Sequence, residues 1–89
     1  MKIVWTPKAR EDYLHWSKTD QKILAAINDL IEDIQRDPFK GLGKPEPLKY
    51  ALQGLWSRRI TRDDRLVYRV SGKGKDRQLE IIQCRYHYK

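Results

Sequence analysis

Glu46, Arg65 and His87 carry the three kinds of side chain that cleavage of RNA without a metal ion requires. A base takes the proton from a 2′-hydroxyl, a cation holds the charge that develops on the phosphate, and an acid protonates the departing 5′-oxygen. Glu46 is the only acidic residue between Lys40 and Arg62, which makes it the candidate base. Both acid–base groups also have a structural interpretation, because a loop glutamate is commonly solvated and a histidine can simply end a strand.

Further basic and aromatic side chains of the same half of the chain could hold a nucleic acid. Lysine and arginine neutralise phosphates, and exposed aromatic rings stack on bases. The residues expected to contact RNA in this way are Lys44, Lys49, Tyr50, Arg58, Arg59 and Arg85, with Tyr88 near the end of the chain. Three other aromatic residues are expected in the core instead: Trp56, Tyr68 and Tyr86.

The positive charge of the chain lies entirely in its second half. The net charge is +7; residues 40–89 contain thirteen basic and five acidic residues, a net +8, whereas residues 1–39 contain six and seven, a net −1. A one-sided basic field suits a surface that binds a polyanion, because bound phosphates release their counterions. The alternative is a basic surface that only keeps the protein in solution.

Length and composition restrict the class of protein. A chain of 89 residues, 39% hydrophobic and 35% charged, predicts one folded domain over residues 1–89. No apolar run could cross a membrane and no secretion signal is visible, so we expect a cytoplasmic protein. The single Cys84 cannot form an internal disulfide, and the two histidines have no metal-ligand spacing, so we expect neither a metal site nor a cofactor.

The chain opens with a short predicted strand, Lys2 to Trp5, and then a helix. Thr6 suits the N-cap and Pro7 the first helical position, and the helix should run to about Lys18.

A second helix has the clearest pattern in the sequence. Asp20, or Thr19 before it, caps the helix, which ends at Asp37-Pro38 because the residue before a proline avoids helical backbone angles. Its apolar residues recur at helical spacing and predict a face packed in the core: Ile23, Leu24, Ile27, Leu30, Ile31 and Ile34.

The second half reads as a loop followed by three antiparallel strands. The loop, residues 37–47, contains two glycines and three prolines, which disfavour regular structure. The strands are predicted at Leu55 to Thr61, Arg65 to Val70 and Leu79 to Tyr88, joined by a tight turn at residues 62–64 and a longer basic turn at residues 71–78. Together the elements predict an α+β fold in which two N-terminal helices pack on one face of a small twisted antiparallel sheet.

The alternation of side chains along a strand predicts which residues face the helices. The helix-facing set is Leu66, Tyr68, Val70, Ile82, Cys84 and Tyr86. Arg65 and His87 would then share the opposite, uncovered face of the sheet, together with Arg85. An uncovered basic sheet face is suited to an extended RNA chain.

Three stretches of the sequence, KGLGKPEPLKYALQGLWSRRIT, DRLVYRV and CRYHY, resemble the YoeB/Txe family of bacterial toxins within the RelE/ParE superfamily. The opening KIVWTPKAREDYLHW and the second helix also match, so the resemblance spans nearly the whole chain. It implies a RelE-like fold, which agrees with the elements predicted above.

The resemblance implies a toxin of a type II toxin–antitoxin system that acts as a ribosome-dependent mRNA endoribonuclease, or mRNA interferase. Such an enzyme cuts mRNA in the ribosomal decoding site without a metal ion and so inhibits translation. The implied catalytic residues are Glu46 as general base, Arg65 as the stabiliser of the transition state, His87 as general acid, and Tyr88. Lys44, Lys49 and Arg59 are implied to bind RNA phosphates or ribosomal RNA.

The resemblance also implies partners: a YefM/Axe (Phd-like) antitoxin with an acidic C-terminal segment, and operator DNA bound by the complex. A homodimer is left open. The sequence departs from the family in two places, since Lys89 follows the final tyrosine and the turn at residues 71–78 is longer and more basic.

The competing class is a protein that binds without cutting, either a ParE-like toxin or a basic nucleic-acid-binding module. Glu46 and His87 discriminate between the classes, because a pure binder has no need of an acid–base pair beside its basic surface.

Overall fold

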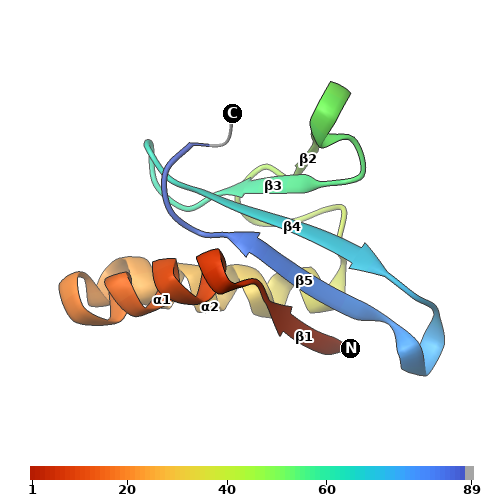
Figure 1. The fold of residues 1–89 in the computed structure, drawn as a ribbon, viewed down its shortest axis with the longest axis horizontal. Coiled ribbons are helices and arrows are strands. Elements are labelled where there is room, and N and C mark those ends of the chain that lie inside the picture. The colour runs from red at the N-terminus through yellow and green to blue at the C-terminus, as the bar shows by residue number, and fades with distance from the viewer. Residues whose placement is uncertain (88–89) are drawn as a thin grey trace.

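The computed structural model describes residues 1–87, and its helices and main strands follow the predicted order (Figure 1). The elements are β1 (Lys2–Trp5), α1 (Pro7–Thr19), α2 (Gln21–Arg36), β2 (Glu46–Pro47), the 3-10 turn η1 (Tyr50–Leu52), β3 (Trp56–Arg59), β4 (Arg65–Ser71), the 3-10 turn η2 (Gly74–Asp76) and β5 (Gln78–Gln83). Both helices lie on one side of the sheet, which confirms the predicted α+β arrangement. The two-residue β2 was not predicted, because it lies within the proline-rich loop.

The predicted caps define the beginnings of both helices. The Thr6 hydroxyl accepts a hydrogen bond from the amide of Ala9 at 3.1 Å, with Pro7 at the first helical position. The Asp20 carboxylate accepts from the amides of Lys22 and Ile23 at 3.0 and 3.1 Å. Each cap satisfies amides that have no partner within the helix.

The sheet has five strands in the order β1-β5-β4-β3-β2. Its pairs are antiparallel except that β1 runs parallel to β5, with Ile3 opposite Leu79 and Trp5 opposite Ile81. The sheet is therefore mixed, whereas a wholly antiparallel sheet was predicted. The difference arises because the opening strand joins the sheet at the free edge of the last strand.

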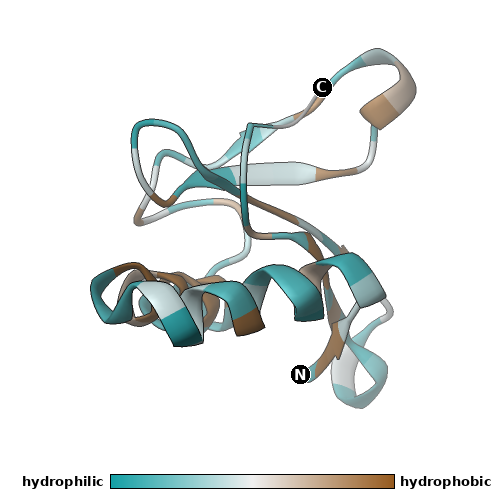
Figure 2. Ribbon diagram, turned by 60° about the vertical axis from the view of Figure 1, so that its left-hand side comes forward, coloured by the Kyte–Doolittle hydropathy of each residue, from teal (hydrophilic) through white to brown (hydrophobic). Residues whose placement is uncertain are grey.

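The hydrophobic core lies between the helices and the sheet. Figure 2 shows hydrophobic colour along strands beside the helices, whereas the loops at the ends of the sheet are mostly hydrophilic. The buried residues of the core are Ala9, Trp16, Ile27, Leu30, Ile31, Ile34, Leu66, Tyr68, Leu79, Ile81 and Cys84. The predicted apolar stripe of α2 is thus confirmed as core packing. Within residues 1–87 no helix is long and apolar enough to cross a membrane.

A register shift corrects the predicted orientation of β5. Val67 pairs with Gln83, and the next residue, Tyr68, pairs with Ile81. Ile82 therefore has no partner in β4 and forms a β-bulge. Such a bulge reverses the alternation of side chains beyond it. Ile81 is therefore in the core together with Cys84, and the prediction that Ile82 faces the helices was wrong.

The loop before β2 is held by Arg58, which is fully buried. Its guanidinium donates to the Asp33 carboxylate at 2.5 Å and to the Tyr68 hydroxyl at 3.2 Å. It also donates to the carbonyl oxygens of Asp37, Lys40 and Leu42 at 2.7, 3.0 and 3.1 Å. Hydrogen bonds from the Leu42 amide and from Arg58 hold the pKa of the Asp33 carboxyl below its usual value.

One glycine allows this close packing of the loop. Gly41 has a φ of +125°, and a Cβ at this position would lie 2.1 Å from a carboxylate oxygen of Asp33. Any larger residue would therefore displace the ion pair that holds the loop, and with it the start of β2.

Candidate active site and RNA interface

Glu46, Arg59 and Arg65 project from the sheet face opposite the helices. Residues directly opposite each other in adjacent strands share a face. One such row runs through Glu46, Ser57, Val67 and Gln83, and the neighbouring row on that face pairs Arg59 with Arg65. The strands that carry Glu46 and Arg65 are two spacings apart, about 10 Å. We call Glu46, Arg59 and Arg65 the charged sheet face; Ser57 and Val67 beside them are buried, so this face is only partly open.

Arg65 is oriented by the turn that precedes it. Its Nη1 donates to the carbonyl oxygens of Thr61, Asp64 and Arg62 at 2.9, 3.1 and 3.3 Å. Its Nε and Nη2 make no hydrogen bond to residues 1–87, so two donor nitrogens of an already oriented guanidinium remain for a phosphate. A planar, pre-organised guanidinium is well suited to the charge of a phosphate in its transition state.

The chain after β5 leaves the sheet, so the last strand ends at Gln83, earlier than predicted. Figure 1 shows this C-terminal segment, residues 84–87, passing to the side of the sheet away from the helices. Asp12 accepts a hydrogen bond from the Cys84 amide at 3.1 Å, and the Trp16 indole donates to the Cys84 carbonyl at 2.8 Å. Helix α1 therefore fixes the point at which the segment departs.

The turn before β4 holds the same segment at its other end. The Tyr86 amide donates to the Asp64 carboxylate at 2.7 Å, and the Tyr86 carbonyl accepts from the Arg65 amide at 3.0 Å. These bonds bring the residue before His87 beside Arg65. His87 is exposed and lines a hollow with Lys8, Gln83, Arg85 and Tyr86.

Arg85 and Tyr86 take positions that strand alternation did not predict, because the segment is no longer a strand. The Arg85 guanidinium lies 4.5 Å from the centre of the Tyr86 ring and 5.9 Å from that of Trp16. Tyr86 is 56% exposed, so the prediction that it faces the core was wrong.

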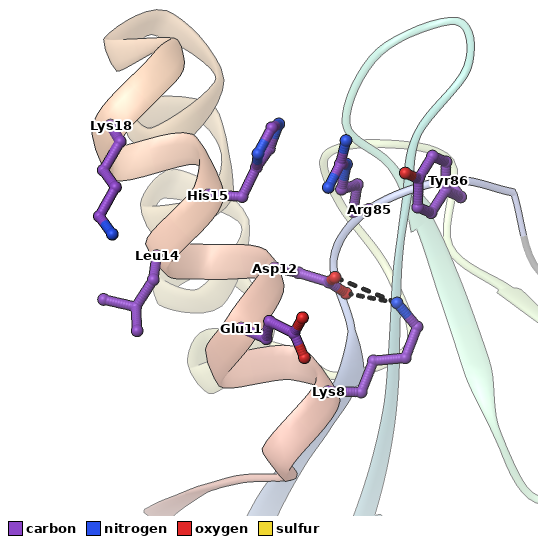
Figure 3. A pocket seen from close by; sticks show the side chains of 8 residues that line it. All are labelled: Lys8, Glu11, Asp12, Leu14, His15, Lys18, Arg85 and Tyr86. Atoms are coloured by element: carbon purple, nitrogen blue, oxygen red, sulfur yellow. Dashed lines mark hydrogen bonds and ion pairs between the residues drawn. The ribbon is translucent and has the colours of Figure 1, made fainter.

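Figure 3 shows Arg85 and Tyr86 beside α1, across a hollow lined also by Lys8, Asp12 and His15. Lys8 is paired with the Asp12 carboxylate at 3.0 Å. Arg85 is thus held between aromatic rings next to α1 and does not stand in the row of Arg59 and Arg65.

The remaining predicted RNA contacts fall into two groups. Lys44, Lys49 and Tyr50 are exposed on the loops that flank β2, and Tyr50 is 91% exposed with a left-handed φ of +57°. Arg58, by contrast, was wrongly predicted to contact RNA: strand alternation directs it into the core, where it binds the loop. Tyr88 lies outside the described residues.

Sequence reasoning missed Asp64 and Asp12, the two carboxylates that hold the C-terminal segment. Both bond to backbone amides far away in the sequence, so no local spacing marks them. The turn at residues 62–64 was predicted, and an aspartate next to Arg65 was the one available signal.

Cys84 has the surroundings of a structural residue. Burial, and then the nearby Asp12 carboxylate, raise the pKa of its thiol to about 12. Among residues 1–87, no group of three or more His, Cys, Asp or Glu side chains is arranged to hold a metal ion.

Comparison with known proteins identifies what this chain is similar to. A family described as the YoeB-like toxin of bacterial type II toxin–antitoxin systems matches residues 5–88. The toxin YoeB of Streptomyces coelicolor is 57% identical over 88 residues, which cover 99% of this chain and 100% of that protein.

Solved structures give the same result. A YoeB/ParE toxin from Agrobacterium tumefaciens is 57% identical, with a TM-score of 0.97 over 99% of this chain and 100% of that one. YoeB of Staphylococcus aureus has been solved as a dimer, 42% identical with a TM-score of 0.88, and in complex with YefM, 40% identical with a TM-score of 0.87. Each of these two covers 99% of this chain and 98% of the matched chain.

Proposed function

We propose that this chain, which belongs to the YoeB family of toxins of bacterial type II toxin–antitoxin systems, is an mRNA endoribonuclease that cleaves messages in the decoding site of the ribosome. The single observation that carries the proposal is the charged sheet face. An acid and two arginines project from one face of adjacent strands, and the residue before a histidine is bonded to the backbone of one of those arginines.

In the proposed reaction the Glu46 carboxylate takes the proton of a 2′-hydroxyl, whose oxygen attacks the adjacent phosphorus. The new 2′-oxygen–phosphorus bond replaces the bond to the 5′-oxygen, and His87 gives that oxygen its proton as it departs. Arg65 stabilises the charge on the phosphate through the donors that its turn leaves available. The products are a 2′,3′-cyclic phosphate, or the 3′-phosphate formed by its hydrolysis, and a 5′-hydroxyl; Tyr88 is assigned to the same site.

The RNA would be held by cations and one aromatic ring around β2. Lys44, Lys49 and Arg59 are exposed and could neutralise successive phosphates or contact ribosomal RNA. Tyr50 offers an exposed ring for a base to stack on. Arg85 is a weaker candidate, because its guanidinium already packs on two aromatic rings.

The proposed partners follow from the same family. The Staphylococcus aureus relative forms a complex with YefM, and we propose an antitoxin of that type here, with operator DNA bound by the complex. The basic second half of the chain would attract the acidic segment of such an antitoxin. A homodimer is also proposed, after the dimer of the same relative. A ribosomal target places the protein in the cytoplasm.

The test is cleavage of a defined message in a translating extract, with cut positions mapped by primer extension. Wild-type protein is compared with Glu46→Gln and His87→Ala. Glu32→Gln and His15→Ala are matched controls, since they change the same residue types on the helices. We expect wild type and both controls to cut at the decoding site, and each active-site substitution to slow cutting by about 10²-fold or more.

Ribosome binding, measured by co-sedimentation, should survive both active-site substitutions. Fragments that end in a cyclic phosphate and begin with a 5′-hydroxyl would support the reaction as written. If the wild-type protein binds ribosomes or RNA without cutting, or instead inhibits DNA gyrase in a supercoiling assay, the nuclease proposal is wrong and the binding class holds.

A further inference from the structure

The Asp64 carboxylate joins two parts of the molecule that the proposed reaction must bring together. One oxygen accepts a hydrogen bond from the amide of Tyr86 at 2.7 Å, and the other accepts one from the hydroxyl of Thr61 at 2.8 Å. The Thr61 hydroxyl in turn accepts from the amides of Asp63 and Asp64, each at 3.1 Å. The turn therefore holds one oxygen of the carboxylate in place, and the other oxygen bonds to the C-terminal segment.

Tyr86 needs such a fixed partner, because its backbone conformation is unfavourable. Its φ of +66° lies in the left-handed region, which a residue with a side chain seldom adopts. Residues in that region persist where their surroundings hold them. Here the Tyr86 amide is held by Asp64 and its carbonyl by the Arg65 amide.

The conformation of Tyr86 sets the direction of the next residue, His87. If the bond to Asp64 is lost, Tyr86 can relax toward an extended conformation, and the imidazole of His87 then moves relative to Arg65. A displacement of about 1 Å in a catalytic group costs on the order of 10²-fold in rate.

We infer that Asp64 is a positioning residue for the general acid: its carboxylate clamps the Tyr86 backbone so that His87 faces the phosphate held by Arg65. The inference rests on the proposed function. It assigns to Asp64 an effect on His87 and no contact with the RNA.

One bond within the turn, from the Thr61 hydroxyl, involves the Asp64 carboxylate; the other bonds of Asp64 in the turn come from its backbone atoms. The amides of Ile60 and Thr61 donate to its backbone carbonyl, at 3.0 and 3.3 Å. Within residues 1–87 the Arg65 guanidinium likewise bonds only to backbone carbonyls of the turn. Truncating the Asp64 side chain therefore leaves these backbone bonds possible. It removes two hydrogen bonds, one from the Thr61 hydroxyl in the turn and one from the Tyr86 amide of the C-terminal segment.

The experiment compares Asp64→Ala and Asp64→Asn with the same changes at Asp63. Asp63 is the exposed neighbour in the turn, and its carboxylate makes no hydrogen bond or ion pair with residues 1–87. The two positions thus change net charge equally. Single-turnover cleavage is measured on ribosomes that carry a defined message, with toxin in excess.

We expect Asp64→Ala to slow cleavage by about 10- to 100-fold, with ribosome binding unchanged. Asp64→Asn keeps an oxygen acceptor and should slow cleavage less, by several-fold. The two Asp63 variants should stay within about twofold of wild type.

A second substrate separates positioning of the acid from loss of structure. A message with sulfur in place of the bridging 5′-oxygen at the cut releases a thiolate, which needs no proton from an acid. On this substrate the defects of Asp64→Ala and His87→Ala should both shrink, whereas the defect of Glu46→Gln should remain. Adding Asp64→Ala to His87→Ala should cause no further loss on the ordinary substrate.

Two results would overturn the inference. One is a cleavage defect of Asp64→Ala that persists on the sulfur substrate, or that multiplies the defect of His87→Ala. It would show that Asp64 acts through Arg65 or through the stability of the protein, and not through His87. A wild-type rate in Asp64→Ala would show that the clamp does not matter.

Failure of the proposed function is distinguishable from both results, because the wild-type protein would then not cut either substrate. In that case hydrogen exchange still tests the clamp. Asp64→Ala should speed exchange at the Tyr86 amide by 10-fold or more relative to Asp63→Ala, and equal exchange would overturn the clamp itself.

Discussion

The indole of Trp16 donates its hydrogen to the carbonyl oxygen of Cys84 at 2.8 Å, across 68 positions of sequence. This bond fixes the point where the last strand ends and the C-terminal segment begins. Asp12, one turn earlier on α1, accepts a hydrogen bond from the amide of Cys84. The helix therefore contributes to the candidate active site by holding the backbone from which His87 extends.

Replacing Trp16 with phenylalanine should lower the free energy of unfolding by about 1–2 kcal/mol, because a buried carbonyl loses its donor. Urea denaturation followed by circular dichroism measures this change. Trp56→Phe is the matched control and should cost less, since the Trp56 indole makes no hydrogen bond within residues 1–87. Equal losses in the two variants would show that the bond from Trp16 contributes little.

Arg58 and Arg59 are adjacent but should have opposite roles. Arg58→Ala leaves the carbonyls of the loop without their guanidinium donor and leaves the Asp33 carboxylate with the Leu42 amide but no paired cation. It should cost about 3 kcal/mol or more of stability. Arg59→Ala removes an exposed cation and should change stability by less than about 0.5 kcal/mol. Urea midpoints test the first expectation.

Arg59→Ala should instead weaken binding of a single-stranded RNA and reduce the dependence of binding on salt by about one charge. Affinities measured at several salt concentrations test this. A folded Arg59→Ala protein with an unchanged salt dependence would remove Arg59 from the RNA interface.

The lowered pKa of the Asp33 carboxyl predicts how stability depends on pH. Its folded-state pKa is below its unfolded value, so the contribution of this carboxylate is present above about pH 4 and is lost as the pH falls through the folded value. Asp33→Asn should thus be less stable than wild type at pH 7, and the difference should narrow below pH 4. Urea midpoints at pH 7, 4 and 3 measure it; a difference that stays constant contradicts the expectation.

Cys84 should resist thiol reagents in the folded protein. With a pKa of about 12, its thiolate fraction at pH 8 is roughly 10³-fold lower than that of an exposed cysteine. Reaction with a chromogenic disulfide should be slower by at least that factor in buffer than in guanidinium chloride. Rapid modification of the native protein would mean that the segment after β5 opens readily.

Tyr50 offers a change that separates binding from stability. The residue is 91% exposed and has a left-handed φ, which asparagine adopts more readily than tyrosine. Tyr50→Asn should therefore leave the thermal midpoint unchanged or raise it. If a base stacks on the ring, RNA affinity should fall by about 1–3 kcal/mol; unchanged affinity would exclude stacking at this position.

Local patterns in the sequence were sufficient to predict the helices and main strands. Thr6, Pro7 and Asp20 lie at the predicted caps, and the apolar stripe of α2 is buried as its spacing indicated. These features depend on neighbours within a few residues, which a sequence displays directly. The parallel pairing of β1 with β5 depends on distant residues, and no local pattern indicated it.

The candidate site could be predicted in its residue types more readily than in its geometry. Alternation along β4 correctly put Arg65 on the face away from the helices. It failed at Ile82, where the strand has a bulge. It also failed for Tyr86 and Arg85, because the chain no longer follows a strand after Gln83. Arg58 was misjudged for a different reason: its charge suggested the surface, whereas the many carbonyl acceptors of the loop made burial possible.

The order of the strands also bears on how the chain folds as it is synthesised. β1 has one neighbour in the sheet, β5, and residues 6–77 intervene between them. β1 is synthesised before β5 and therefore cannot pair in the sheet until β5 has been made. Contacts between such distant segments form slowly. His87 follows β5 almost at once. The sheet is thus completed and His87 reaches its position at the same late stage of synthesis. A nascent chain that lacks β5 has neither a complete sheet nor the candidate acid.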